Sequence, residues 1–276
     1  MLSRPLDIAG GRVVVAEVAP GRPGALAFRV FARGRISARE ASEAEAAMRT
    51  CLALDEDLRP FYDLARELDA DAPRRAPLPR LAWAVAAGGG RLLRSPTVFE
   101  DAVKTLCTTN CTWALTRTMV RNLVDRLGAT GPGGARTFPG AGALAARPEA
   151  FFREAIRAGY RAGAMRSIAR EVASGALDIE GWRGSALATD DLAARVRELP
   201  GFGPYATEHL LRLLGRYDHL ALDSWTRSKL ARVRGLRRQP SDGAIARWYR
   251  PYGRFAGLAM WLEVTADWHG AKPTWP

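Results

Sequence analysis

One carboxylate draws attention because of the residues around it. Asp223 follows the second glycine of a Gly201-Phe202-Gly203 turn by 20 residues, and Leu, Ala and Trp side chains flank it. An ionised carboxylate in such a setting can stabilise positive charge in a transition state and orient or deprotonate a water. Asp223 also has the position of an N-cap for a helix over 224–233, worth about 1 kcal/mol. The two roles are compatible, because a helix N-terminus favours the charged carboxylate.

The turn before Asp223 has the properties of an anion-binding site. Gly201 and Gly203 allow a sharp bend and the close approach of a ligand, and Pro204 can open a helix. Free backbone amides at such a turn, directed along a helix axis, suit a phosphate. With a second helical pattern over 189–198, the stretch predicts helix, hairpin, helix.

The remaining elements divide into two predicted domains. Strand patterns at 12–17 and 25–32 and helical patterns at 38–52 and 58–68 precede a charged, proline-rich boundary at 69–80. We therefore expect a strand-plus-helix domain over residues 1–78 and a helical domain over 79–276. In the second domain, one expected helix begins at 95–96 and ends at the polar run 108–110. The other expected helices cover 81–87, 113–127, 159–172 and 244–264, and the last is interrupted at 251–253. Residues 128–142, with six glycines and two prolines, are expected to lack regular structure.

Composition favours a polyanionic partner. The net charge is +12, and 38 of the 41 basic residues are arginine, because only Lys104, Lys229 and Lys272 are lysines. Such a surplus suits nucleic acid. Three cysteines, Cys51, Cys107 and Cys111, suggest a reducing compartment and provide no metal site. No apolar signal segment or membrane span is expected, and neither is a cofactor.

The hairpin and Asp223 together resemble the helix-hairpin-helix superfamily of DNA glycosylases. The motifs LLRSP (92–96), GYRA (159–162) and PYG (251–253) are similar to its alkylpurine and 8-oxoguanine branch. The resemblance implies a mainly α fold of two helical subdomains with a small N-terminal α+β domain. It also implies a monomer in the bacterial cytoplasm, associated with the nucleoid, that acts on double-stranded DNA containing damaged bases. Such an enzyme extrudes the damaged nucleotide and hydrolyses its N-glycosidic bond, here with Asp223. Some relatives carry an iron–sulfur loop after the catalytic Asp, which this chain lacks because no cysteine follows Cys111.

The resemblance assigns DNA contacts to further residues. Asn110 corresponds to a side chain that fills the gap left by the extruded nucleotide. Tyr160 corresponds to an intercalating side chain, and Arg161 to one facing the orphaned base or a phosphate. The residues alone also allow Asn110 to be a helix cap and Tyr160-Arg161 to be an ordinary surface pair. The remaining phosphate contacts are assigned to Gly201, Phe202, Gly203, Arg227 and Lys229.

One departure from the family predicts how the strand is processed. Bifunctional relatives place a lysine two residues after the second hairpin glycine, where its amine attacks the sugar and forms a Schiff base. This sequence has Tyr205 at that position and no lysine in the hairpin. We therefore expect a monofunctional enzyme that uses water and has no β-lyase activity.

Other departures bear on the substrate. Residues of the 8-oxoguanine branch that read the base or its partner are replaced by Leu115, Trp225 and Gly257. A base pocket of Tyr205, Trp225 and Trp261 would select alkylated, cationic purines by stacking and cation–π attraction, which is similar to 3-methyladenine glycosylases. Three alternatives remain open: an oxidised-purine glycosylase without lyase activity, a non-catalytic hairpin module that binds DNA, and aromatic residues that only pack the core.

Overall fold

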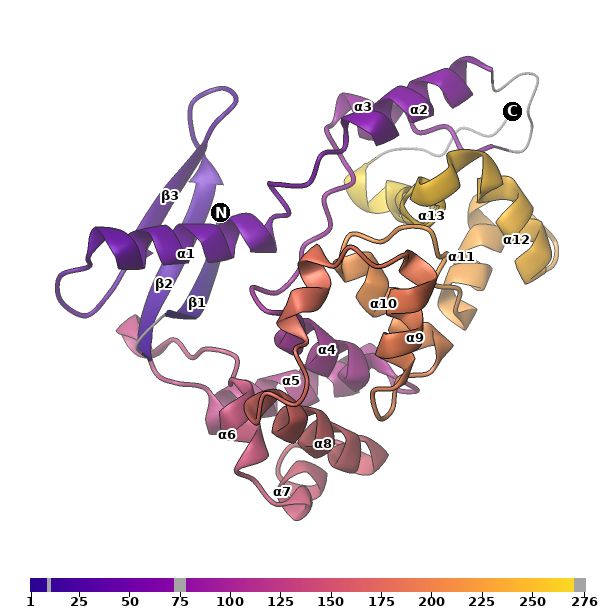
Figure 1. Cartoon of the computed structure of the whole chain (residues 1–276). Helices are drawn as coiled ribbons and strands as arrows, with labels where there is room; N and C mark the ends of the chain where they lie inside the picture. The colour runs from indigo at the N-terminus through magenta and orange to yellow at the C-terminus, as the bar shows by residue number, and fades with distance from the viewer. Residues whose placement is uncertain (9–10, 72–77, 271–276) are drawn as a thin grey trace. The chain divides into compact units, whose positions relative to one another are not determined.

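The computed structural model describes residues 1–8, 11–71 and 78–270. They are mainly helical, with one small sheet near the N-terminus (Figure 1), which confirms the predicted fold class. The chain forms two compact units that alternate along the sequence. The first comprises Met1–Asp55, Leu93–Ser185 and Glu198–Phe202, and the second Glu56–Leu92, Ala186–Arg197 and Gly203–Pro276. The predicted boundary between residues 78 and 79 stays a prediction, and residues 72–77 beside it lie outside the described residues.

A three-stranded antiparallel sheet opens the first unit. Strands β1 (Leu2–Ile8), β2 (Arg12–Pro20) and β3 (Leu26–Phe31) lie in the order β1-β2-β3, and helix α1 (Ala38–Cys51) crosses one face (Figure 1). Alternate residues of β2 pack against α1, as period-2 patterning requires. Strand β1 was not predicted from the sequence, because charged residues and Pro5 break its alternating pattern. This proline is tolerated because β1 is an edge strand.

The rest of the first unit is helical. It contains α4 (Val98–Thr108), α5 (Trp113–Leu127), α6 (Ala141–Ala145), α7 (Glu149–Glu154) and α8 (Ala162–Ala173), with 3-10 turns at Pro132–Gly134, Gly159–Arg161 and Glu180–Gly184. The expectation that residues 128–142 lack regular structure was wrong. Gly133 and Gly134 have φ of 63° and 78°, so they build a tight turn that lets Thr130 and Arg136 pair as a β-bridge. Helix α6 then begins inside the same segment.

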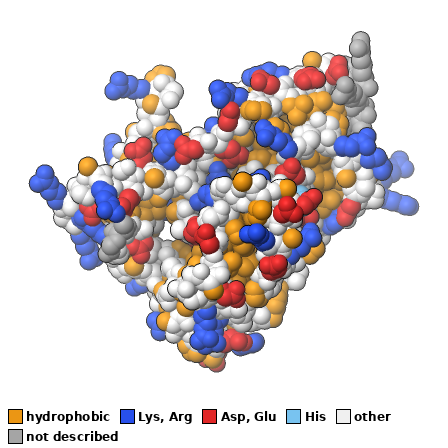
Figure 2. Space-filling model, viewed as in Figure 1, with side chains coloured by type: hydrophobic (Ala, Val, Ile, Leu, Met, Phe, Trp, Pro, Cys, Tyr) orange, Lys and Arg blue, Asp and Glu red, His pale blue; other side chains and the backbone are white. Residues whose placement is uncertain are grey.

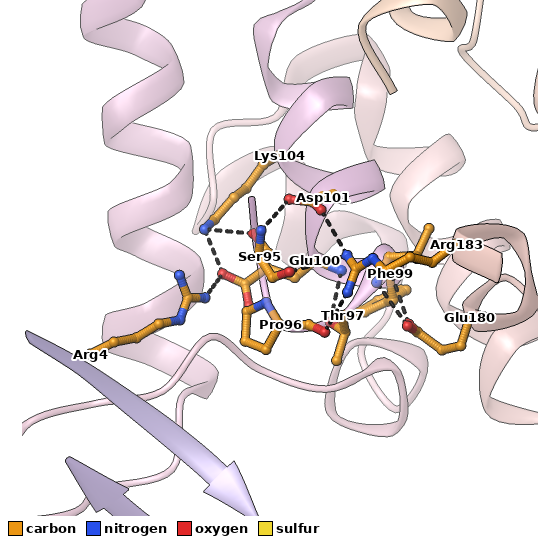
Figure 3. Close-up of polar contacts among 11 residues, drawn as sticks. Arg4, Ser95, Pro96, Thr97, Phe99, Glu100, Asp101, Lys104, Glu180 and Arg183 are labelled. Atoms are coloured by element: carbon orange, nitrogen blue, oxygen red, sulfur yellow. Dashed lines mark hydrogen bonds and ion pairs between the residues drawn. The ribbon is translucent and has the colours of Figure 1, made fainter. Parts of the chain in front are cut away.

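A partly buried polar network joins the sheet to the start of α4 (Figure 3). Glu180 accepts hydrogen bonds from the backbone amides of Val98 and Phe99, at 2.8 and 2.9 Å. These amides begin a helix and would otherwise lack partners. Asp101 accepts from the Ser95 amide at 2.8 Å and from Arg183 at 3.2 Å. Burial nevertheless raises the pKa of Asp101 to about 6. Strand β1 is tied in by an ion pair between Arg4 and Glu100.

The second unit packs its helices around α13 (Ala256–Thr265), which is buried along almost its whole length. The surrounding elements are α2 (Arg59–Ala70), α3 (Ala82–Ala86), α9 (Thr189–Arg197), α10 (Pro204–Leu213), α11 (Ser224–Val233) and α12 (Asp242–Tyr249), with 3-10 turns at Arg250–Phe255 and Ala266–His269. The predicted interruption at 251–253 is confirmed, because the Arg250–Phe255 turn separates α12 from α13. Within this core Arg234 and Glu263 form an ion pair at 2.7 Å. The Glu263 carboxylate also accepts a hydrogen bond from the Tyr249 hydroxyl, so this buried charge has two partners.

The described residues show neither a membrane span nor a metal cluster. None of their helices has both the length and the apolar character to cross a bilayer. In the same part of the chain, no three His, Cys, Asp or Glu side chains gather as a metal site would require.

Candidate active site

The hairpin between α9 and α10 has the predicted tight turn. Gly201 has a φ of 81°, and the Phe202 amide donates to the Leu199 carbonyl at 3.0 Å. A Cβ on Gly201 would lie 2.8 Å from Leu106 Cδ1, so glycine is required here on both conformational and steric grounds. Gly201 and Gly203 are exposed, whereas Phe202 is buried. The two glycines can present backbone to a phosphate, while the Phe202 side chain anchors the turn.

Asp223 caps helix α11, as its alternative role predicted. Its Oδ1 accepts a 2.6 Å hydrogen bond from the Thr226 amide. Its Oδ2 accepts no hydrogen bond from any residue in the described part of the chain. Ala221, two residues earlier, is buried and has a φ of 51°, a strained conformation of the kind that gathers at functional sites. The helix cap thus holds one carboxylate oxygen and leaves the other without a hydrogen-bond donor among the described residues.

One face of α10 points toward Asp223. Tyr205, His209 and Arg212 are spaced i, i+4 and i+7, which places them on one helix face. The Tyr205 and His209 rings lie 4.3 Å apart, and Arg212 Nη2 donates to the Leu220 carbonyl at 2.9 Å, so it holds the loop that carries Asp223. Tyr205 was predicted from the sequence, whereas His209 and Arg212 were not, although helical spacing from Tyr205 could have indicated both.

Burial controls the charge of both missed residues. Desolvation, with a smaller effect of Arg212, lowers the pKa of His209 to about 4, and Asp223 opposes the shift. His209 is therefore neutral at physiological pH, and its Nε2 has no hydrogen-bond partner among the described residues. Desolvation also lowers the pKa of Arg212, to about 10, with Asp223 again opposing the shift. Arg212 consequently keeps its positive charge.

Three tryptophans gather beside this helix face. The predicted pair Trp225 and Trp261 have ring centroids 6.4 Å apart. Trp268, which the sequence analysis did not single out, lies 5.8 Å from Trp225 and 5.9 Å from Trp261. Trp225 is 42% exposed and Trp268 61% exposed, so these two rings are not simply core. The Arg212 guanidinium carbon stands 5.1 Å from the Trp261 ring centroid and connects the three rings, the tryptophan cluster, with Asp223.

Asn110 and Tyr160 come together in the first unit. Asn110 lies between α4 and α5 with a φ of 42°. Thr109 and Thr112 hold the cap positions of the two helices, so the alternative interpretation of Asn110 as a helix cap was wrong. Its Nδ2 lies 3.4 Å from the Tyr160 hydroxyl, and the Tyr160 side chain is 58% exposed. The two residues predicted to enter the base stack therefore form one exposed pair.

Three basic residues are less available than predicted. Arg161 is only 3% exposed. It donates to the Thr109 carbonyl and hydroxyl and stands 4.4 Å from the Tyr160 ring, so it supports Tyr160 instead of facing outward. Lys229 is buried in a 2.5 Å ion pair with Asp267. Arg227 is half-buried and pairs with Asp242 at 2.7 Å. The sequence could not indicate these partners, which lie far along the chain or on another helix.

Gly257 has a steric explanation. Its amide donates to the Tyr217 carbonyl at 2.7 Å, and a Cβ there would lie 2.1 Å from the His219 carbonyl oxygen. No side chain can occupy position 257 in this backbone. The packing of the 217–219 segment therefore excludes any larger residue at this position, including one that would read a base.

The comparisons with known proteins identify the fold. No family model and no curated protein matches the sequence. A solved structure of the 3-methyladenine DNA-glycosylase from Archaeoglobus fulgidus is similar with a TM-score of 0.74 and 20% identity over 98% of this chain and 88% of that one. The chain has the fold of the helix-hairpin-helix DNA glycosylases. The Clostridium acetobutylicum 8-oxoguanine glycosylase/lyase bound to double-stranded DNA is also similar, with a TM-score of 0.67 and 20% identity over 97% of this chain and 88% of that one.

These similarities confirm the resemblance at the level of the fold. One of these proteins is a 3-methyladenine glycosylase and the other an 8-oxoguanine glycosylase/lyase, so the same fold accommodates different bases. The fold alone therefore does not identify a substrate for this chain. Substrate specificity depends on the side chains around Asp223.

Proposed function

We propose that this protein is a monofunctional DNA glycosylase that excises a damaged purine, with alkylated purines as the leading substrate class. The observation that carries the proposal is Asp223, which has one oxygen fixed by the α11 cap and the other oxygen open. It lies near the tryptophan cluster, which offers apolar faces for a base. Together with the glycosylase fold, these features favour an enzyme over a module that only binds DNA.

The proposed reaction uses the side chains of the second unit. The damaged nucleotide leaves the duplex, which costs less when the base is already poorly paired, and the base stacks beside Trp261. As the C1′–N bond breaks, its electron pair goes to the base and positive charge builds on the sugar. The open oxygen of Asp223 stabilises this charge and accepts a proton from water as the new C1′–O bond forms. The Thr226 amide fixes the other carboxylate oxygen at the N-terminus of α11.

The lysines support the monofunctional assignment. Tyr205 stands on the helix face where bifunctional enzymes of this fold carry the amine. Lys104 pairs with Glu100 and Lys229 with Asp267, and Lys272 lies outside the described residues. An amine nucleophile is therefore absent from the face of α10 that carries Tyr205, His209 and Arg212.

The test is base release from two labelled duplexes, one methylated and one containing 8-oxoguanine, each with and without hot alkali. We expect release of methylated purine and strand breakage only after alkali. Asp223→Asn keeps the geometry of the side chain but not its charge, and we expect it to lower the single-turnover rate on the order of a hundredfold or more. Asp191→Asn, an exposed acid on α9, is the matched control and should retain activity.

Other outcomes would contradict specific parts of the proposal. Strand breakage without alkali would contradict the monofunctional assignment. Release of 8-oxoguanine alone would favour the oxidised-purine alternative. DNA binding without release from either duplex would favour the non-catalytic module.

A further inference from the structure

A buried positive charge lies next to the tryptophan cluster, although the aromatic residues alone suggest a site that attracts cations. Arg212 is almost fully buried and stands 5.1 Å from the centroid of Trp261. Its Nη2 is fixed by the Leu220 carbonyl at 2.9 Å, and its Nε has no hydrogen-bond partner among the described residues. A guanidinium held in this way cannot withdraw into solvent. The site therefore contains a fixed positive charge.

The neighbouring groups determine the net charge around Arg212. Asp223 has the largest opposing effect on Arg212, followed by the half-buried Glu208. His209 on the same helix face adds no charge, because it is neutral at physiological pH. These carboxylates would attract a cationic base, and the positive charge of Arg212 opposes that attraction from beside Trp261.

Arg212 also makes the Trp261 ring less attractive to a positively charged base. An aromatic ring attracts a cation through its negative face, and Arg212 already makes this interaction. A base stacked on the opposite face would lie about 3.5–4 Å from the ring. A positive charge on that base would then be repelled by the guanidinium across the indole. A neutral purine keeps the stacking and avoids this repulsion.

We propose that Arg212 makes this site select uncharged damaged purines over cationic ones. The inference rests on the proposed function, because it takes the extruded base to lie against Trp261 beside Asp223. Among the substrates of the proposed function, it predicts tighter binding of uncharged damaged purines, alkylated or oxidised, than of the cationic purines that DNA methylation produces. It replaces the expectation from the sequence that cation–π attraction selects cationic alkylpurines.

A pair of duplexes that differ only in the charge of one base tests the proposal. One carries 7-methylguanine, which is cationic, on a 2′-fluorinated sugar that resists hydrolysis. The other carries 7-methyl-7-deazaguanine, its neutral isostere, on the same sugar. Electrophoretic mobility assays with the full chain give the ratio of the two dissociation constants. This ratio cancels general effects on DNA affinity.

Three variants separate charge from structure. Arg212→Met removes the charge and keeps the length of the side chain, Arg212→Lys keeps the charge, and Arg195→Met removes an exposed arginine of α9 as a matched control. We expect wild type, Arg212→Lys and Arg195→Met to bind the neutral duplex at least as tightly as the cationic one. Arg212→Met should shift the ratio toward the cationic duplex by about tenfold, as one removed charge in a partly desolvated site predicts. Melting temperatures check that each variant is folded, and Arg212→Gln replaces Arg212→Met if the latter is not.

The outcomes distinguish this inference from the proposed function. An Arg212→Met ratio equal to that of wild type, with both affinities reduced equally, would mean that Arg212 is only structural and would overturn the inference. Tighter binding of the cationic duplex by the wild-type protein would also overturn the inference. If wild type binds neither duplex more tightly than undamaged DNA, the site does not hold a base. If the ratio shifts as expected but no base is released from any natural substrate, charge selection stands and the enzymatic proposal fails.

Discussion

Two desolvated ionisable groups, Asp101 and His209, give the stability of this protein opposite dependences on pH. The pKa of Asp101 is raised by burial to about 6 from an ordinary 3.8, so the folded state binds the proton more tightly. Its contribution to stability is therefore greatest at pH 4 and below, and about 3 kcal/mol of it is lost as pH rises to 6. The pKa of His209 is lowered to about 4 from 6.5. Its contribution is full above pH 6.5, and about 3 kcal/mol of it is lost as pH falls to 4.

We predict that single substitutions expose each effect. As pH falls from 6.5 to 4, the free energy of unfolding of His209→Phe should increase relative to that of wild type, because the variant lacks the His209 effect and keeps the Asp101 effect. In Asp101→Asn, it should decrease more steeply than in wild type over the same window. Denaturant titrations at a series of pH values measure both slopes. Parallel wild-type and variant profiles would show that these two groups do not titrate as their burial implies.

At the scale of elements, the hairpin glycines have different roles. Gly201 has a φ of 81° and a Cβ there would approach Leu106 to 2.8 Å, whereas a Cβ on Gly203 would meet nothing within 4 Å. Gly203 also has an ordinary φ of −85°. We predict that Gly201→Ala lowers the free energy of unfolding by about 1–3 kcal/mol, and that Gly203→Ala changes it by less than about 0.5 kcal/mol.

Thermal and denaturant unfolding measure this difference, and Gly203→Ala serves as the matched control. Equal destabilisation by the two substitutions would contradict the steric argument. Since both glycines are exposed, affinity for undamaged duplex DNA then tells whether a phosphate approaches either backbone so closely that an added Cβ blocks it. This second measurement is independent of folding.

Most helices were predictable because each has a local signal. Thr97, Thr112 and Ser241 cap α4, α5 and α12, and Pro204 opens α10, so the pattern alone placed their starts closely. Strand β1 was missed because its pairing with β2, and not its own composition, makes it a strand. The turn at 132–134 was missed because glycine-rich sequence predicts flexibility equally well.

The site was predictable only where a motif marked it. Asp223, Trp225 and Trp261 followed from the hairpin and its resemblance. His209 and Arg212 did not, because an aspartate and a tryptophan far along the chain give them their properties. The burial of Arg161 and Lys229 likewise depends on Thr109 and Asp267, which no local pattern connects to them.

At the scale of the whole molecule, the surplus of arginine is the dominant property. Figure 2 shows basic side chains projecting from much of the visible surface, with acidic side chains among them. The net charge of +12 favours association with DNA and makes it dependent on salt. Basic residues with internal acidic partners, such as Lys229 and Arg234, are not available for phosphate.

We predict that the logarithm of the affinity for undamaged duplex falls linearly with the logarithm of salt concentration, with a slope of about −0.9 per phosphate contacted. Lys229→Met should leave this slope unchanged, because its charge is already paired with Asp267, although it should destabilise the fold. Salt titrations of binding measure the slope. A slope that becomes less steep by about one in Lys229→Met would indicate that this lysine contacts phosphate after all.

The tryptophan cluster also gives the protein an optical property. Its three indoles lie 5.8–6.4 Å apart with planes inclined at 40° to 83°, close enough for their electronic transitions to couple. Coupled and tilted transitions produce circular dichroism and absorb and emit differently from isolated rings. A base stacked on Trp261 would disturb this coupling directly. The same rings that would hold a flipped base thus provide an intrinsic signal of its arrival, one that requires no label on the DNA or the protein.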